Sequence, residues 1–156
     1  MFIWQEPSWK SAKRPEMKTL CDSSAFAKRY VDEKGSQEVD NVCRATSALA
    51  LSVVCVPEII SALNRWVREK RLSPQEYIAA KSRLSEDVAD AVIVNLTPAV
   101  IARSTFLLET NVLRAMDALH VACALEWGAE LFVSCDDRQI KAAKRAGLRT
   151  RRIETG

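Results

Sequence analysis

The sequence predicts an α/β fold in which short strands alternate with helices along one continuous domain. Two observations favour it: short strand-like runs are separated by longer helical segments, and residues typical of helix starts and stops lie between the two. Strands separated by helices imply a parallel sheet covered by helices on both faces. The length of 156 residues suits a single domain with a real core.

The elements predicted in the first half are a strand at 18–22, helices at 23–32 and 36–44, a strand at 49–54 and a helix at 57–70. Gly35 is expected to break the chain between the first two helices. Pro57 fits the first position of the third helix, where a missing N–H leaves no hydrogen bond unmade.

The elements predicted in the second half are a helix ending near 90, a strand at 91–94, helices ending near 110 and at 127, a strand at 130–135, a helix at 137–146 and a strand at 148–153. Ser73 to Glu76 form a capping box, and Thr97 precedes Pro98 in a second helix start. Gly128 and Gly147 are typical helix stops.

Composition excludes some classes of protein. No apolar run approaches the ~20 residues that span a bilayer, so no membrane segment is expected. Five cysteines without a CxxC pair are typical of buried thiols in a reducing cytosol, which predicts a cytoplasmic protein. Residues 1–16 lack the apolar core of a signal peptide. We expect them to be a disordered arm or an upstream extension, whose Trp4 and Trp9 suit stacking or docking, and residues 17–156 to be the folded domain.

Four carboxylates, Asp22, Glu58, Asp117 and Asp136, lie where a strand ends or a helix begins. In a parallel α/β sheet the carboxyl ends of the strands share one edge, and ligands bind there. Taken singly, each acid also fits helix capping or the helix dipole. Together they predict a cation site at that edge.

The chemistry of such a cluster favours a hard metal ion. Carboxylates ~5 Å apart repel by roughly 3 kcal/mol per pair at an effective dielectric near 20, so a filled site is favoured over an empty one. Oxygen ligands without His or Cys suit Mg²⁺ or Mn²⁺. The matching reaction is metal-assisted hydrolysis of a phosphodiester bond.

Four segments carry a family resemblance: 20–25 (LCDSSA), 57–63 (PEIISAL), 116–124 (MDALHVACA) and 133–136 (VSCD). In this order they resemble the signature segments of PIN-domain nucleases, and above all the VapC-type toxins of toxin–antitoxin pairs. The likeness extends over residues 18 to about 153.

The resemblance implies a three-layer α/β/α sandwich on a parallel sheet and a Mg²⁺- or Mn²⁺-dependent endoribonuclease. It assigns Asp22, Glu58, Asp117 and Asp136 as catalytic metal ligands, direct or through water. Ser24 and Ser134 match hydroxyl positions that order the same pocket. It also implies an RNA substrate, a small cognate antitoxin and a homodimer.

Some nearby residues have alternative interpretations. Asp137 follows Asp136 and suits either the first turn of a helix or an auxiliary ligand. His120 lies three positions after Asp117, but a histidine without a carboxylate to orient it is weak evidence for a general base, so we expect a supporting role. Ser23 is expected to cap the helix after Asp22.

Basic residues crowd the last twenty positions, and they are Arg138, Lys141, Lys144, Arg145, Arg149, Arg151 and Arg152. They suit either a solvated helix face or a surface that contacts phosphates. The alternative to a nuclease is a PIN-like module that binds RNA or protein without cleaving. A phosphatase is disfavoured because no second aspartate follows two residues after Asp22.

Overall fold

The computed structural model describes residues 17–156, and the predicted N-terminal arm lies outside the described residues. The strands are β1 (Lys18–Cys21), β2 (Ala48–Ser52), β3 (Val92–Val94), β4 (Leu131–Ser134) and β5 (Arg149–Arg152). They form one sheet in the order β3-β2-β1-β4-β5, and every neighbouring pair is parallel. The predicted parallel sheet is confirmed, with β1 at its centre.

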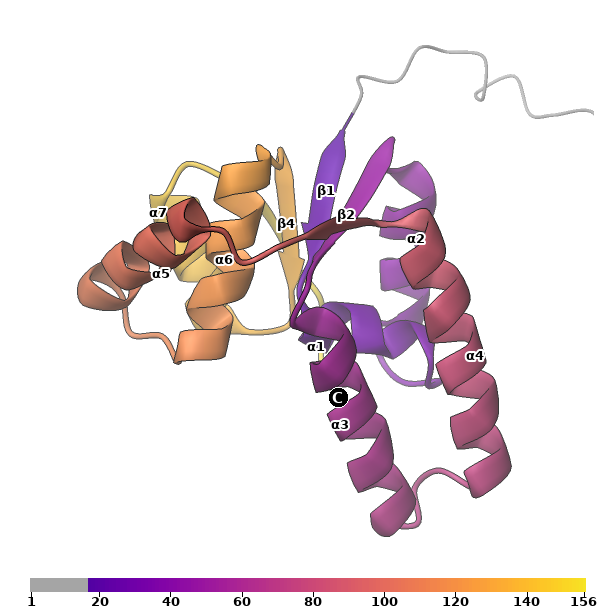
Figure 1. Ribbon diagram of the computed structural model, residues 1–156. Coiled ribbons are helices and arrows are strands. Elements are labelled where there is room, and N and C mark those ends of the chain that lie inside the picture. The colour runs from indigo at the N-terminus through magenta and orange to yellow at the C-terminus, as the bar shows by residue number, and fades with distance from the viewer. Residues whose placement is uncertain (1–16) are drawn as a thin grey trace, which may run out of the picture.

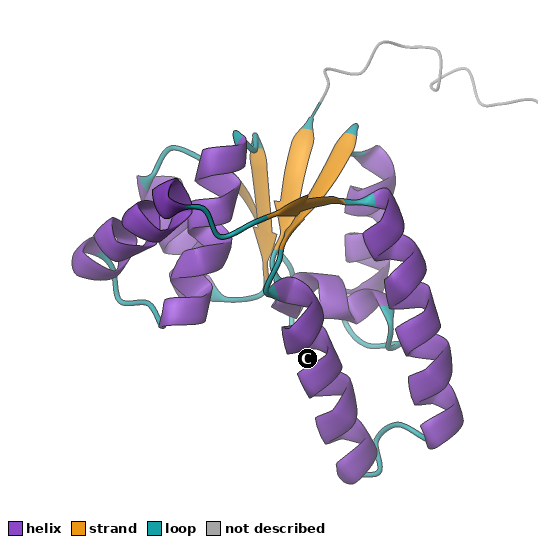
Figure 2. Cartoon of the chain, in the orientation of Figure 1, coloured by secondary structure: helices purple, strands orange, loops and turns teal. Residues whose placement is uncertain are grey.

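Helices cover both faces of this sheet (Figures 1 and 2). The helices are α1 (Ser23–Phe26), the 3₁₀ turn η2 (Ala27–Arg29), α2 (Ser36–Ala45), α3 (Cys55–Arg68), α4 (Pro74–Asp90), α5 (Pro98–Thr110), α6 (Ala115–Trp127) and α7 (Asp137–Arg145). In Figure 1, α5, α6 and α7 lie on one side of the strands and α1 to α4 on the other. The predicted three-layer α/β/α sandwich is therefore confirmed.

Alternation along the strands divides the core in two. Leu20 and Phe132 belong to the apolar cluster under α5 to α7, whereas their neighbours Cys21 and Val133 belong to the cluster under α1 to α4. Successive side chains of a strand point to opposite faces, so a sheet covered on both sides needs apolar residues at every position. This requirement explains why β2 and β4, the two neighbours of β1, are apolar at every position except the last.

Two helices differ from the sequence-based expectation, one at its end and one at its start. The first predicted helix is shorter, because α1 passes at Ala27 into one 3₁₀ turn that ends at Arg29. Helix α3 begins at Cys55, so Pro57 occupies its third position and not its first. The N–H groups of the first turn have no partner within the helix in either case, so the proline is tolerated.

The long α3–α4 hairpin extends past the carboxyl edge of the sheet (Figure 1). Helix α4 begins at the predicted capping box, where Ser73 Oγ accepts from the Glu76 N–H at 3.1 Å and Glu76 Oε2 accepts from the Ser73 N–H at 2.6 Å. Within residues 17–156, no helix combines the length and the apolar character that crossing a bilayer requires.

Candidate active site

A cavity of about 520 Å³ opens at the carboxyl edge of the sheet, and all four predicted acids line it. Asp22 follows β1, Glu58 lies on α3, Asp117 on α6 and Asp136 after β4. Four elements far apart in the sequence therefore supply one acidic lining. Basic side chains also reach this cavity: Lys28, Arg65 and Arg114.

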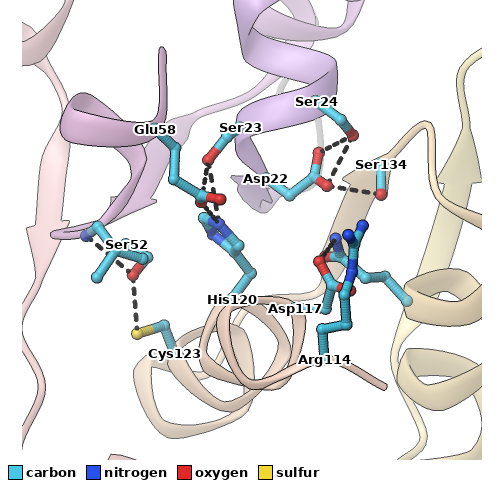
Figure 3. A network of polar contacts seen from close by, with 12 residues as sticks. Asp22, Ser23, Ser24, Ser52, Glu58, Arg114, Asp117, His120, Cys123 and Ser134 are labelled. Carbon is cyan, nitrogen blue, oxygen red and sulfur yellow. Dashed lines mark hydrogen bonds and ion pairs between the residues drawn. The ribbon is translucent and has the colours of Figure 1, made fainter. Parts of the chain in front are cut away.

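The hydroxyl groups of two serines contact the Asp22 carboxylate (Figure 3). Its side chain caps α1 by accepting from the Ala25 N–H at 2.9 Å. Ser24 Oγ lies 2.8 and 2.7 Å from the two carboxylate oxygens, and Ser134 Oγ donates to Oδ2 at 2.8 Å. Ser24 and Ser134, both predicted as pocket residues, are thus in direct contact with this acid.

The residue Asp22 is only 1% exposed. Burial raises the pKa of its carboxyl group, because the charged form loses its water, and the nearby His120 together with the four hydrogen-bond contacts only partly opposes that shift. A carboxylate in this environment gains more from a bound cation than an exposed one does.

Glu58 has different partners. Its Oε1 accepts from Ser23 Oγ at 2.7 Å and lies 2.5 Å from His120 Nε2, and Ser23 Oγ lies 3.0 Å from the same ring nitrogen. Burial tends to raise the pKa of Glu58, but the contacts with His120 and Ser23 outweigh it, so this pKa lies below its usual value.

Two expectations from the sequence are wrong at this point. His120 does have a carboxylate beside it, because Glu58 arrives from a helix that begins 65 positions earlier than His120. Ser23 does not cap α1: Asp22 is the cap, and the Ser23 hydroxyl reaches Glu58 instead. The ring of His120 is buried, and its Nδ1 has no hydrogen-bond partner among residues 17–156.

Asp117 lies in the first turn of α6, and only one of its two carboxylate oxygens accepts a hydrogen bond from the described residues. Gln139 Nε2 donates to its Oδ1 at 3.0 Å. Its Oδ2 is buried and accepts no hydrogen bond from the residues that the structure describes. Arg114 Nε forms an ion pair with this same Oδ2 at 3.5 Å, from a side chain that is 80% exposed. Figure 3 places this pair close to the Asp22 group.

Asp136 serves as the N-cap of α7. Its Oδ1 accepts from the N–H groups of Arg138 and Gln139 at 2.7 and 3.3 Å. Asp137, predicted as a helix-start residue or an auxiliary ligand, forms an ion pair with Arg152 and is not among the residues that line the cavity. The structure therefore favours its helix-start role.

The chemistry of the donor atoms fits a metal ion, whereas the acids as they now lie do not form a complete metal site. Among the described residues, no three His, Cys, Asp or Glu side chains are grouped closely enough to hold an ion as they now lie. The donors themselves fit a hard divalent cation, since they are carboxylate and hydroxyl oxygens. Oδ2 of Asp117 accepts no hydrogen bond from the described residues, and its ion pair is with the exposed Arg114, so this oxygen can take a further positive partner.

Gln139 and Arg114 are site residues that the sequence did not single out. Gln139 lies on the buried side of α7, one turn after Asp136, and a polar residue at a core position of an amphipathic helix is the signal that points to it. Arg114 precedes the first turn of α6, and nothing local distinguishes it from other exposed arginines.

The fold, with four acids around one cavity at the carboxyl edge of a parallel sheet, defines an α/β protein with a hydrolase-like acidic site. The PIN domain family model matches residues 19–145. The chain therefore belongs to the PIN-domain family, as the sequence segments predict.

Individual known proteins are also similar to most of this chain. The chain is 32% identical over 130 residues to "Ribonuclease VapC45" of Mycobacterium tuberculosis (strain CDC 1551 / Oshkosh), covering 82% of this chain and 90% of the relative. Similar solved structures are VapBC2 from Rickettsia felis bound to a promoter DNA fragment (TM-score 0.63, 12% identity, 88% and 100% coverage) and the sarcin-ricin loop cleaving toxin VapC20 from Mycobacterium tuberculosis (TM-score 0.62, 17% identity, 83% and 95% coverage). These two likenesses concern the fold.

Proposed function

We propose that this chain is a metal-dependent endoribonuclease that hydrolyses RNA phosphodiester bonds, and that it is the toxin of a toxin–antitoxin pair. The observation that carries the proposal is the meeting of Asp22, Glu58, Asp117 and Asp136 around one cavity in a PIN-domain chain. The 32% identity to a relative named as a VapC ribonuclease supports the reaction class.

Asp22 and Asp117 are the first candidates to hold Mg²⁺ or Mn²⁺, because one is fully buried and the other has an unpartnered oxygen. Glu58 and Asp136 would complete the site directly or through water. When bound, such an ion lowers the pKa of water for attack and neutralises charge on the phosphate.

The remaining polar side chains fix the acids. Ser24 and Ser134 leave the Asp22 carboxylate one orientation, while Ser23 and His120 do the same for Glu58. Gln139 orients Asp117 from the side opposite its free oxygen. Groups held in place before substrate arrives need no reorganisation during the reaction, which is how such supporting contacts raise a rate.

The toxin role and its partners rest on relatives. A solved structure of similar fold is a toxin–antitoxin complex from Klebsiella pneumoniae, and the VapBC2 structure is bound to promoter DNA. By analogy we infer that a small cognate antitoxin covers this cavity, that the toxin is a homodimer, and that it acts in the cytoplasm.

The proposal is tested by incubating purified protein with a mixed RNA pool in Mg²⁺, Mn²⁺ or EDTA. Wild type should cut in either metal and not in EDTA, and Asp22→Asn should reduce cutting by more than a hundredfold, since even residues that only support metal ligands contribute ten- to a hundredfold. Asp90→Asn, which removes an exposed acid at the end of α4, is the matched control and should cut like wild type.

Equal cutting by wild type and Asp22→Asn would point to a contaminating nuclease. Absence of cutting by every variant, with RNA binding retained, would favour the alternative of a PIN-like module that binds without cleaving.

A further inference from the structure

Helix α7 presents a basic face that begins beside the acidic cavity. Its buried side is formed by Gln139, Ile140, Ala142 and Ala143. Its exposed basic residues are Arg138, Lys141, Lys144 and Arg145. At 100° per residue these four positions fall within an arc of about 120°, so they share one face of the helix.

The charges of this face are almost entirely of one sign. The only acid exposed on α7 is Asp137, and it is paired with Arg152. The exposed surface of α4, by contrast, mixes both signs: Glu76, Lys81, Arg83, Glu86 and Asp90. Mixed signs are typical of a helix face that simply meets water, whereas a face of one sign is typical of a surface that binds the opposite charge.

The basic side chains of α7 are also not neutralised by the residues that the structure describes. Among residues 17–156, no ion pair involves Arg138, Lys141 or Lys144. Arg145 contacts only the Thr110 carbonyl and the Asn111 side chain, at 3.4 and 3.3 Å. Other exposed arginines of this chain, such as Arg103 and Arg151, are paired with glutamates.

The basic face of α7 begins next to the acidic cavity. Asp136, which lines the cavity, accepts from the Arg138 N–H, so the first basic residue is two positions from an acid of the cavity. From Arg138 to Arg145 the helix rises about 10 Å, so the basic side chains are spread along the helix and can contact more than one phosphate of a strand.

We propose that Arg138, Lys141, Lys144 and Arg145 form a track for the RNA backbone, along which one flank of the substrate strand leaves the acidic cavity. The track rests on the proposed ribonuclease function and adds the path that the RNA strand takes as it leaves the cavity. Contacts of this kind hold phosphates, so the track positions RNA without selecting its sequence.

Two triple variants test the track. Arg138→Gln/Lys141→Gln/Lys144→Gln removes three charges from α7, and glutamine keeps the helix propensity. The control, Arg44→Gln/Lys81→Gln/Arg83→Gln, removes three exposed charges from α2 and α4 on the other face of the sheet, and none of the three lines the acidic cavity. Both change the formal net charge from +3 to zero, so they differ only in where the charge is lost.

Binding of a fluorescein-labelled oligouridylate is measured in EDTA over a series of salt concentrations. The α7 triple should flatten the slope of log affinity against log salt by about 2, and weaken binding at low salt on the order of tenfold to a hundredfold. The control triple should stay near wild type, and Lys141→Arg/Lys144→Arg, which keeps the charges, should bind normally.

Equal losses in the two triples would mean that binding follows net charge alone, and an unchanged slope in the α7 triple would mean that no phosphates lie there. Either result overturns the track. If the α7 triple variant has a lower Tm than wild type, the single variant Lys141→Gln is measured in its place. The slope of log affinity against log salt should then change by about 0.7.

Cleavage is measured separately in Mg²⁺, where the α7 triple should raise KM and leave kcat near wild type. A wild-type protein that does not cut RNA refutes the nuclease, while the salt series in EDTA still decides whether the track exists.

Discussion

Asp22 and Glu58 line the same cavity, yet the protein treats them differently. Asp22 is buried among hydroxyl and amide donors, and its pKa is raised by burial. Glu58 is partly exposed, touches an imidazole, and its pKa is lowered. Two adjacent serines each donate a hydrogen bond to one of these acids: Ser23 donates to Glu58, and Ser24 donates to Asp22.

This difference separates two ways of stabilising a carboxylate. Glu58 already has a partner within the chain that favours its charged form. Burial outweighs the donors around Asp22, and Oδ2 of the neighbouring Asp117 accepts no hydrogen bond from the described residues, so both acids have room for a cation from outside. This difference predicts that metal binding depends most on Asp22 and Asp117. It also predicts that His120 acts by positioning Glu58.

The largest effect should come from Asp117→Asn on the response to metal. Wild-type protein at a Mn²⁺ concentration of 100 Kd should gain about 2.7 kcal/mol of stability, seen as a rise in Tm of several degrees. The variant should lose most of this rise while its metal-free Tm stays equal or increases, because a buried carboxylate whose Oδ2 accepts no hydrogen bond from the described residues is replaced by a neutral amide. Glu58→Gln should retain part of the response. A metal-free Asp117→Asn that melts well below wild type, with the response intact, would make Asp117 a structural residue.

A smaller effect is expected at His120. His120→Leu removes the ring nitrogen that holds Glu58, so kcat should fall by about ten- to a hundredfold. His120→Gln offers an N–H at a similar reach and should recover part of the rate, together with part of the Mn²⁺-induced rise in Tm. If leucine and glutamine are equally impaired in both measurements, the ring contributes only packing.

The smallest effect should appear in the pH dependence of unfolding. The pKa of Asp22 is higher in the folded state than in the unfolded chain, so its ionised form opposes folding at neutral pH. That penalty should disappear as the pH falls through the folded pKa. Metal-free Asp22→Asn lacks this titration. The difference in urea unfolding free energy between wild type and variant should therefore shift in favour of wild type as the pH is lowered from neutral through the folded pKa, and a pH-independent difference would contradict the comparison.

The order of the elements was predictable from the sequence because it depends on local signals. Ser73 and Thr97 cap helices through their own backbone neighbours, and Asp22 follows directly after its strand. The carboxyl edge of a parallel sheet then brings the acids together without any knowledge of side-chain packing. That is why the four acids were found, while the exact start of α3 was not.

The contacts around Glu58 were not predictable, because they join elements far apart in the chain. Glu58 and His120 are separated by 62 positions, and their meeting depends on how α3 and α6 approach the sheet from opposite sides. The early end of α1 has a similar cause. Just past it, Arg29 and Tyr30 turn toward Asp87 on α4, and this tertiary contact replaces further helical turns.

The central position of β1 has a consequence for the order in which the chain is made. Asp22 is among the first described residues to leave the ribosome, but its N–H donates to the Val133 carbonyl and its carboxylate accepts from Ser134. The part of the cavity lining that carries Asp136 and Gln139 follows Asp22 by more than a hundred residues in the chain. A nascent chain that stops short of β4 therefore has no assembled site, so any activity that the site supports begins only after β4 and the start of α7 have been synthesised.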